Sequence, residues 1–495
     1  MDFCVARLNA DGTLDTAFDG PSGSGNGKFL LPIGAGTDRA NAVALQPDGK
    51  IVLAGYCHNG SNDDFCVARL NTDGTLDTSF DGPSGSGNGK FLLPISTSSD
   101  VAEAVAIQPD GKIVLAGNCG NSAIPDFCVA RLNPDGTLDT SFDGPSGASD
   151  GKFTFPIGTS SDRASAVALQ PDGKIVVAGA CFNGSNGDFC LARYLPSGAL
   201  DTTFNTTGNV IAAIGSDQDA AYALALQPDG KIVVAGACWN GNSNDFCLAR
   251  YLPSGALDTS FNTTGTAITH IVSGNSVATA VALQPDGKIV AAGHCSNGSN
   301  HDFCLARYLA SGALDTSFNT TGKVITAIGL IDDDATALAL QPDGKIVAAG
   351  SCWNGSSNDF CLARYLPSGA LDPSFNGSGK VITAIGSDHD AAFALALQPD
   401  GKIVAAGQCY NGGKYELCLA RYEGGPFDAR NCSMDIDGDN LVLATTDSLI
   451  HARIALGLTG NAVIGGITFA SHATRTTWPA IRDYLVSQCG MSIVP

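Results

Sequence analysis

Residues 221–238 read AYALALQPDGKIVVAGAC, in which two apolar runs flank a Pro-Asp-Gly turn. Proline presets the φ angle of such a turn, and glycine accepts the positive φ that a bulged hairpin requires. The stretch therefore predicts two antiparallel strands. The motif DFCLARY at residues 245–251 predicts a third strand, and a segment such as KVITAI at residues 323–328, after the turn region SGALDTSFNTTG, predicts a fourth. These strands together make one antiparallel sheet.

The same unit recurs along most of the chain of 495 residues. The block QPDGK begins seven times, at Gln46, Gln108, Gln170, Gln227, Gln284, Gln341 and Gln398. The motif DFC(V/L)AR begins at Asp2, Asp64, Asp126, Asp188, Asp245, Asp302 and Asp359, and a degenerate copy, ELCLAR, begins at Glu416. Residues 2–422 are therefore one repeat array, and the array contains neither a helical period nor an apolar run of about 18 residues.

This array predicts an all-β fold, a seven-bladed β-propeller of four-stranded antiparallel blades over residues 1–422. A parallel β-helix would need much shorter repeats, and separate sheets would leave both faces in water. The composition supplies the buried surface, since 44% of the residues are hydrophobic and 15% are charged. Because a closed ring leaves no sheet edge unpaired, we expect the last hairpin, at 392–422, to be completed by the strand near 28–32. The strands at 2–8 and 416–422 should compete for one place.

The sequence ALALQPDGKIVVAG, followed by DFCLARYLPSGALDTSF, resembles the delta-60 repeat family. The resemblance covers every copy of the repeat. It implies a β-propeller fold and a location outside the cytoplasm, because members of this family are common in secreted bacterial proteins. Their activity is poorly defined, so the resemblance implies no particular reaction.

Each AGxC cysteine precedes a DFC cysteine by nine residues, and we expect the two to lie directly opposite in a hairpin. A zinc site would need four ligands, whereas each loop offers two thiols without a regular histidine, so disulfides are favoured over metal. The expected bridges are Cys57–Cys66, Cys119–Cys128, Cys181–Cys190, Cys238–Cys247, Cys295–Cys304, Cys352–Cys361, Cys409–Cys418 and, in the tail, Cys432–Cys489. They predict an extracellular or periplasmic protein. Cys4 lacks a partner and the first residues are unlike a signal peptide, so we expect the true start upstream.

The net charge of −21 disfavours a nucleic-acid partner. Aspartate recurs eight residues before the glutamine of QPDG in six units, at Asp38, Asp100, Asp162, Asp219, Asp333 and Asp390. These side chains are predicted to form an acidic ring at one mouth of the central channel. The alternative is that each aspartate caps its own turn.

Each unit also places an aspartate eight residues after an arginine, as in Arg250 and Asp258. A residue required in every blade supports the fold, so we expect a partly buried ion pair. Function is more readily sought where the repeat breaks. Aromatic residues follow the first cysteine of the hairpin in some units only, at Phe182, Trp239, Trp353 and Tyr410.

These four aromatic residues are candidate ligand-binding residues, because exposed rings beside Asn and Ser suit stacking on sugars. The alternative is local packing, with Trp239 opposite Phe246 and Trp353 opposite Phe360.

The tail differs from the array. A linker at 423–431 precedes a small α-helical domain at 432–495 that resembles a dockerin or an EF-hand-like motif. The resemblance implies a Ca²⁺ loop with the ligands Asp435, Asp437, Asp439, Leu441 and Asp447. Asn440 stands where glycine is usual, and Asp447 falls one residue late. The second half lacks another D-x-D run, which argues against docking of the dockerin kind.

No nucleophile elbow, P-loop, dinucleotide fingerprint or HExxH motif occurs in the chain. We therefore expect a secreted or cell-surface, non-catalytic binding or scaffold propeller with a calcium-stabilised C-terminal module. The expected partner is a glycan or a cell-surface component, with no nucleic acid and no membrane span. The alternative is a secreted glycan-active hydrolase or lyase with its site at one propeller mouth, because the fold alone does not decide activity.

Overall fold

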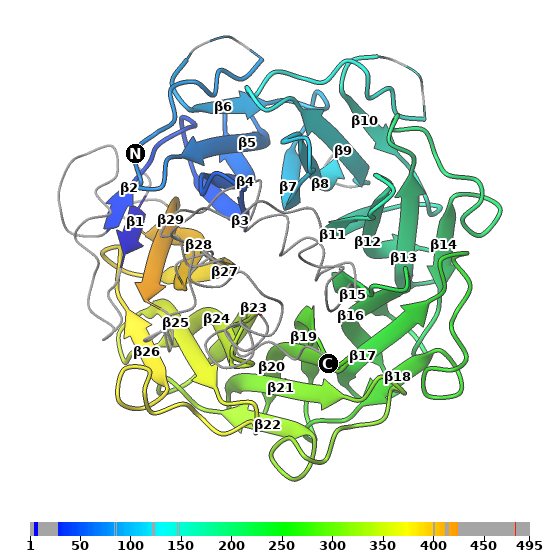
Figure 1. Ribbon diagram of the computed structural model, residues 1–495, viewed down its shortest axis with the longest axis vertical. Coiled ribbons are helices and arrows are strands. Elements are labelled where there is room, and N and C mark those ends of the chain that lie inside the picture. Colours follow the sequence, from blue (N-terminus) through cyan, green and yellow to red (C-terminus); the bar gives the residue numbers. More distant parts are fainter. Residues whose placement is uncertain are drawn as a thin grey trace. The chain divides into compact units, whose positions relative to one another are not determined.

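The computed structural model describes residues 4–7, 28–83, 85, 87–120, 124–145, 147, 149–398, 401–410, 415–423 and 481. The chain divides into two compact units, Met1–Gly425 and Pro426–Pro495. The described residues of the first unit form seven sheets arranged around an axis, a seven-bladed β-propeller (Figure 1). The prediction of blade number and fold class is confirmed for this unit.

Six blades have four antiparallel strands each, in chain order from the axis outward (Figure 1). The first blade contains β3 (Asp38–Leu45), β4 (Ile51–His58), β5 (Asp63–Leu70) and β6 (Lys90–Leu93), and the second contains β7 (Asp100–Ile107), β8 (Ile113–Cys119), β9 (Asp126–Leu132) and β10 (Lys152–Phe155). The third contains β11 (Asp162–Leu169), β12 (Ile175–Phe182), β13 (Gly187–Tyr194) and β14 (Asn209–Ala212), and the fourth contains β15 (Asp219–Leu226), β16 (Ile232–Trp239), β17 (Asn244–Tyr251) and β18 (Thr266–Thr269). The fifth contains β19 (Ser276–Leu283), β20 (Ile289–Ser296), β21 (His301–Tyr308) and β22 (Lys323–Thr326), and the sixth contains β23 (Asp333–Leu340), β24 (Ile346–Trp353), β25 (Asn358–Tyr365) and β26 (Lys380–Thr383).

The seventh sheet closes the ring and has five strands, in the order β2-β1-β29-β28-β27. Its inner strands are β27 (Asp390–Leu397), β28 (Lys402–Tyr410) and β29 (Tyr415–Glu423), and its outer strands are β1 (Cys4–Arg7) and β2 (Lys28–Leu30). As expected, the segment near residue 28 belongs to the last sheet. The expectation that the strands at 2–8 and 416–422 compete for one place is wrong. Instead, β1 pairs in parallel with β29 and pairs with β2 on its other side. Both DFC-type strands thus share one sheet.

Each central strand is buried on both faces, which explains its nearly continuous apolar sequence. In β12, Val177 packs in the core shared with the second blade, and its neighbour Val176 packs in the core shared with the fourth. Close packing of the first two strands also requires the glycine of the AGxC motif. A Cβ on Gly236 would lie 1.9 Å from the carbonyl oxygen of Ala220, beside the bulge of β15. Only glycine fits this approach.

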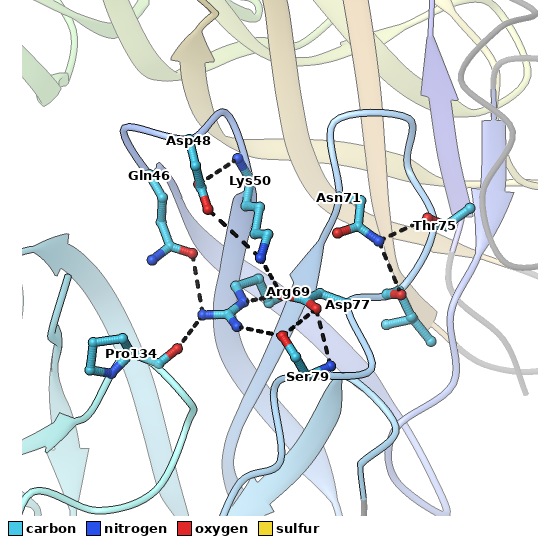
Figure 2. A network of polar contacts seen from close by, with 10 residues as sticks. Gln46, Asp48, Lys50, Arg69, Asn71, Thr75, Asp77, Ser79 and Pro134 are labelled. Atoms are coloured by element: carbon cyan, nitrogen blue, oxygen red, sulfur yellow. Dashed lines mark hydrogen bonds and ion pairs between the residues drawn. The ribbon is translucent and has the colours of Figure 1, made fainter. Parts of the chain in front are cut away.

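The predicted Arg–Asp pair is buried and also joins neighbouring blades (Figure 2). Arg69 Nε donates to Asp77 Oδ2 at 2.7 Å, and Nη1 donates to the carbonyl of Pro134 in the second blade. The Arg69 guanidinium carbon lies 4.4 Å from the centre of the Phe80 ring. The arginine therefore fastens its own turn and the adjacent blade together, as a buried, hydrogen-bonded ion pair can.

Seven disulfides link the second and third strands of the blades, each with the pairing predicted for its blade and with Cα–Cα distances of 5.7–5.9 Å. The expectation that paired cysteines lie directly opposite is wrong. Cys238 lies opposite Asp245 and Cys247 lies opposite Gly236, so the bridge joins diagonal positions. Within the described part of the chain, no helix has the length and hydropathy needed to span a bilayer.

Candidate functional site

The six aspartates of the predicted acidic ring begin the axial strands and are buried, with exposures of 0–2%. Each accepts hydrogen bonds from the backbone N–H groups four and five residues before it, as Asp219 does from Gly215 and Ile214. The carboxylates therefore cap their own turns, which was the alternative to the predicted acidic ring. Because they are buried, they do not present an acidic ring to solvent.

The four aromatic candidates end the second strand of their blades and are partly buried. The cross-strand pairing expected for the packing alternative is wrong. Trp239 lies opposite Asn244 and Trp353 lies opposite Asn358, because the hairpin loop between them is four residues long. The two tryptophan rings therefore lie opposite an asparagine, whereas Phe182 lies opposite Gly187 and Tyr410 opposite Tyr415.

A cavity of about 240 Å³ lies where the sixth and seventh blades meet. Its lining residues are Asn358, His389, Asp390, Ala391, Gln408 and Tyr415. Sites for drug-sized ligands occupy about 300–1,000 Å³. The cavity is thus of a size to hold a single small ring or end group.

Two of the aromatic candidates border this cavity through its lining residues. The Trp353 ring lies 5.7 Å from the ring of His389, and the Tyr410 ring makes an edge contact with Tyr415 at 5.4 Å. Phe182 and Trp239 occupy the equivalent positions in the third and fourth blades. The structure therefore brings Trp353 and Tyr410 to one site and leaves the other two candidates elsewhere on the ring.

Hydrogen bonds fix two polar groups of the cavity. The backbone N–H of Asn358 donates to Nδ1 of His389 at 3.0 Å, so this nitrogen is an acceptor and the ring is held against the sixth blade. Burial raises the pKa of Asp390 to about 7, although three backbone N–H groups oppose the rise and the nearby Asp359 adds to it. Both oxygens of Asp390 are engaged by these N–H groups.

Five lining residues were not predicted from the sequence: Asn358, His389, Ala391, Gln408 and Tyr415. One signal in the sequence could have indicated them, because all five occupy positions that vary between units. The position of His389, for example, is held by Gln218, Asn275 and Asp332 in the three preceding blades. The predicted calcium ligands and the pair Cys432–Cys489 lie outside the described residues, as does the side chain of Cys4.

A family model described as a domain of unknown function (DUF5122) beta-propeller matches residues 2–18, 46–80, 108–142, 170–204, 227–261, 284–318, 341–375 and 398–424. The chain belongs to this family. The matched segments of the DUF5122 propeller run from the QPDG turn to the LDTSF motif in six complete copies. The cavity-lining residues His389, Asp390 and Ala391 lie outside the matched segments.

Solved structures similar to this DUF5122 propeller include two polysaccharide lyases and the protein Sqt1. A PL25 ulvan lyase bound to -[GlcA(1-4)Rha3S]- shares 12% identity at a TM-score of 0.45, over 79% of this chain and 95% of the lyase chain. The polysaccharide lyase Uly1 shares 14% identity at a TM-score of 0.43, over 80% and 91% of the two chains. Sqt1 from Chaetomium thermophilum shares 13% identity at a TM-score of 0.42, over 79% and 98%. No curated protein sequence matches the chain.

Proposed function

We propose that this chain is a secreted or cell-surface propeller that binds a glycan without turnover in the cavity between the sixth and seventh blades. One observation carries the proposal: the cavity combines hydrogen-bonding side chains, Asn358, Gln408 and Tyr415, with the flanking rings of Trp353 and Tyr410. A sugar offers an apolar face to an aromatic ring and hydroxyl groups to amides, so this combination suits it.

The state of Asp390 supports binding over catalysis. A general acid must present its carboxyl group to the leaving oxygen. Both oxygens of Asp390 instead accept hydrogen bonds from backbone N–H groups within the protein, and the residue is 1% exposed. Its raised pKa, about 7, follows from burial in the turn.

A glycan-active hydrolase or lyase with a site at one propeller mouth is the second candidate. Asp390 and Asp359 form a pair of neighbouring carboxyl groups, and burial raises the pKa of both. Glycosidases also use a pair of carboxyl groups. Detection of shortened or unsaturated products from a sugar that the protein binds would favour this candidate.

A location outside the cytoplasm is supported by the seven disulfides, because such bridges persist in oxidising compartments. The family match supports a β-propeller repeat family. We further propose that its repeats are of the delta-60 kind, which the repeated sequence motifs resemble.

The proposal includes a calcium-stabilised C-terminal module, supported by the alternating acids of the segment DIDGDN at 435–440. Calcium should bind the full chain, and Asp437→Ala should remove one bound equivalent. Equal calcium stoichiometry in the two proteins would contradict the assignment.

The glycan site is tested with a glycan array and an activity screen on the same sugars. Trp353→Ser should abolish or strongly weaken binding, because it removes a ring beside the cavity, and serine already occupies this position in the fifth blade, as Ser296. Trp239→Ser is the matched control, since it makes the same change on a blade that does not line the cavity. Equal losses in both variants, or a large fall in melting temperature for Trp353→Ser, would show that the rings only pack.

A further inference from the structure

Two histidines of the fifth blade and one aspartate of the sixth meet at the junction beside the glycan cavity. His294 lies on β20, His301 begins β21, and Asp334 is the second residue of β23. The Nδ1 atoms of His301 and His294 lie 3.2 Å and 3.5 Å from Oδ1 of Asp334. The two imidazole rings are stacked, with centres 4.9 Å apart and an angle of 18° between their planes.

These distances fit a shared ion. Zinc binds nitrogen and carboxylate oxygen at about 2.0–2.2 Å in a tetrahedron, whose ligand atoms are then about 3.4 Å apart. One ligand atom from each of the three residues lies within 4.8 Å of the other two. The three atoms are thus close enough to one another to share one ion.

The repeat provides an internal comparison, because every blade junction has the same three positions. The three equivalents are the residue on the second strand opposite the DFC phenylalanine, the residue before the DFC aspartate, and the second residue of the next axial strand. In the other junctions these are Tyr56, Asp63 and Val101; Asn118, Pro125 and Arg163; Ala180, Gly187 and Ala220; Ala237, Asn244 and Val277; Ser351, Asn358 and Ala391; and Gln408, Tyr415 and Arg39.

At these three positions, only the junction of the fifth and sixth blades carries more than one metal-ligating side chain, and it carries three. The propeller does not need this combination of three residues for folding, since none of the other blade junctions has it. Their coincidence at one junction therefore points to a ligand rather than to a requirement of the fold.

The chemistry of the donors selects the ion. Two imidazoles and one carboxylate suit zinc and other first-row transition ions, whereas calcium and magnesium prefer all-oxygen sites. The three side chains remain 22–39% exposed, so an ion can enter from solvent.

We propose that His294, His301 and Asp334 bind one divalent first-row transition ion, such as zinc, across the junction of the fifth and sixth blades. Three protein ligands leave a coordination position open toward solvent. That position takes water or an oxygen atom of a ligand at the rim. The site is independent of the glycan cavity, which lies at the next junction.

Zinc titration of the full chain by calorimetry tests the proposal, after resident metal has been removed with a chelator and the free thiols have been blocked. His301→Asn and Asp334→Ala use residues that the next junction already has, Asn358 and Ala391, and should therefore fold. Each should bind one equivalent less zinc than the unsubstituted chain, or bind it far more weakly. Loss of an outer hydrogen-bond partner of a metal ligand costs about 10–100-fold in affinity, and loss of a ligand should cost at least that.

The matched control is His58→Phe. His58 also contacts a carboxylate, with Nδ1 3.0 Å from Oδ1 of Asp63, but it lacks a second histidine. Its replacement should leave zinc stoichiometry unchanged. Cobalt should give a visible absorption band with the unsubstituted chain and the control and lose it in the two site variants. Identical zinc stoichiometry and affinity in all four proteins, or no zinc binding by the unsubstituted chain, would overturn the proposal.

Discussion

At the scale of the residue, Arg250 shows how one side chain serves two blades. Its Nε donates to Asp258 Oδ2 at 2.8 Å, and its Nη1 donates to the carbonyl of Ala310 in the next blade at 2.5 Å. The pairing with Asp258 was predictable because the spacing of eight residues recurs. The contact with Ala310 was not, because it joins residues 60 apart and depends on how the blades pack.

Arg250→Gln should lower the free energy of unfolding by about 3–5 kcal/mol, because it leaves the carboxylate of Asp258 buried and unpaired. Chemical denaturation with urea measures the change. The double variant Arg250→Gln with Asp258→Asn removes the unpaired charge and should recover part of the loss. If the double variant is no more stable than the single one, the buried ion pair is not the source of the effect.

At the scale of the element, the hairpin of the second and third strands was predicted correctly in existence and disulfide pairing, but not in register. Cysteine spacing does not determine register, because a disulfide reaches diagonal as well as opposite positions. The assumption of opposite cysteines also produced the wrong partner for Trp239, which faces Asn244. The cavity could not be predicted either, since its lining comes from strands of two blades.

Replacing Cys238 and Cys247 together by alanine should lower the free energy of unfolding by about 2–3 kcal/mol, since the bridge closes a short loop in the unfolded chain. Denaturation under non-reducing conditions gives the difference. Peptide mapping without reduction should also recover all seven nine-residue pairs from the unsubstituted protein. Peptides with mostly free thiols would refute both the bridges and the proposed location.

At the scale of the whole molecule, the pKa is lowered for some buried carboxyl groups and raised for others. In the Arg–Asp pairs the pKa of the aspartate is lowered, as for Asp258 and Asp315. Burial alone would raise this pKa, but hydrogen bonds from the nearby serine and the charge of the arginine outweigh burial. Burial raises the pKa of Asp390 and of Glu103, each to about 7. The fold thus favours ionised carboxylates in the pairs and protonated carboxyl groups at these two positions.

The pH dependence follows from these signs. Groups with lowered pKa stabilise the fold above their ordinary value of 3.8, and that stability is lost as the pH falls through the folded pKa. Groups with raised pKa contribute stability that is present below their ordinary values, 3.8 and 4.5, and is lost as the pH rises to about 7. The melting temperature should therefore be highest near pH 4–5 and decline toward pH 8, and Glu103→Gln should reduce the decline. A melting temperature that rises steadily from pH 5 to pH 8 would contradict this account.

The seventh sheet has a consequence for how the protein is made. Six blades are built from consecutive strands, so each can form as its residues leave the ribosome or the export channel. The strand β1 pairs with β29, which follows it by about 410 residues. At synthesis rates of about 5–20 residues per second, β1 waits roughly 20–80 s for its partner. Closure of the ring is therefore the last event in the biogenesis of the propeller, and an unfinished chain exposes a strand edge that chaperones or other nascent chains can occupy.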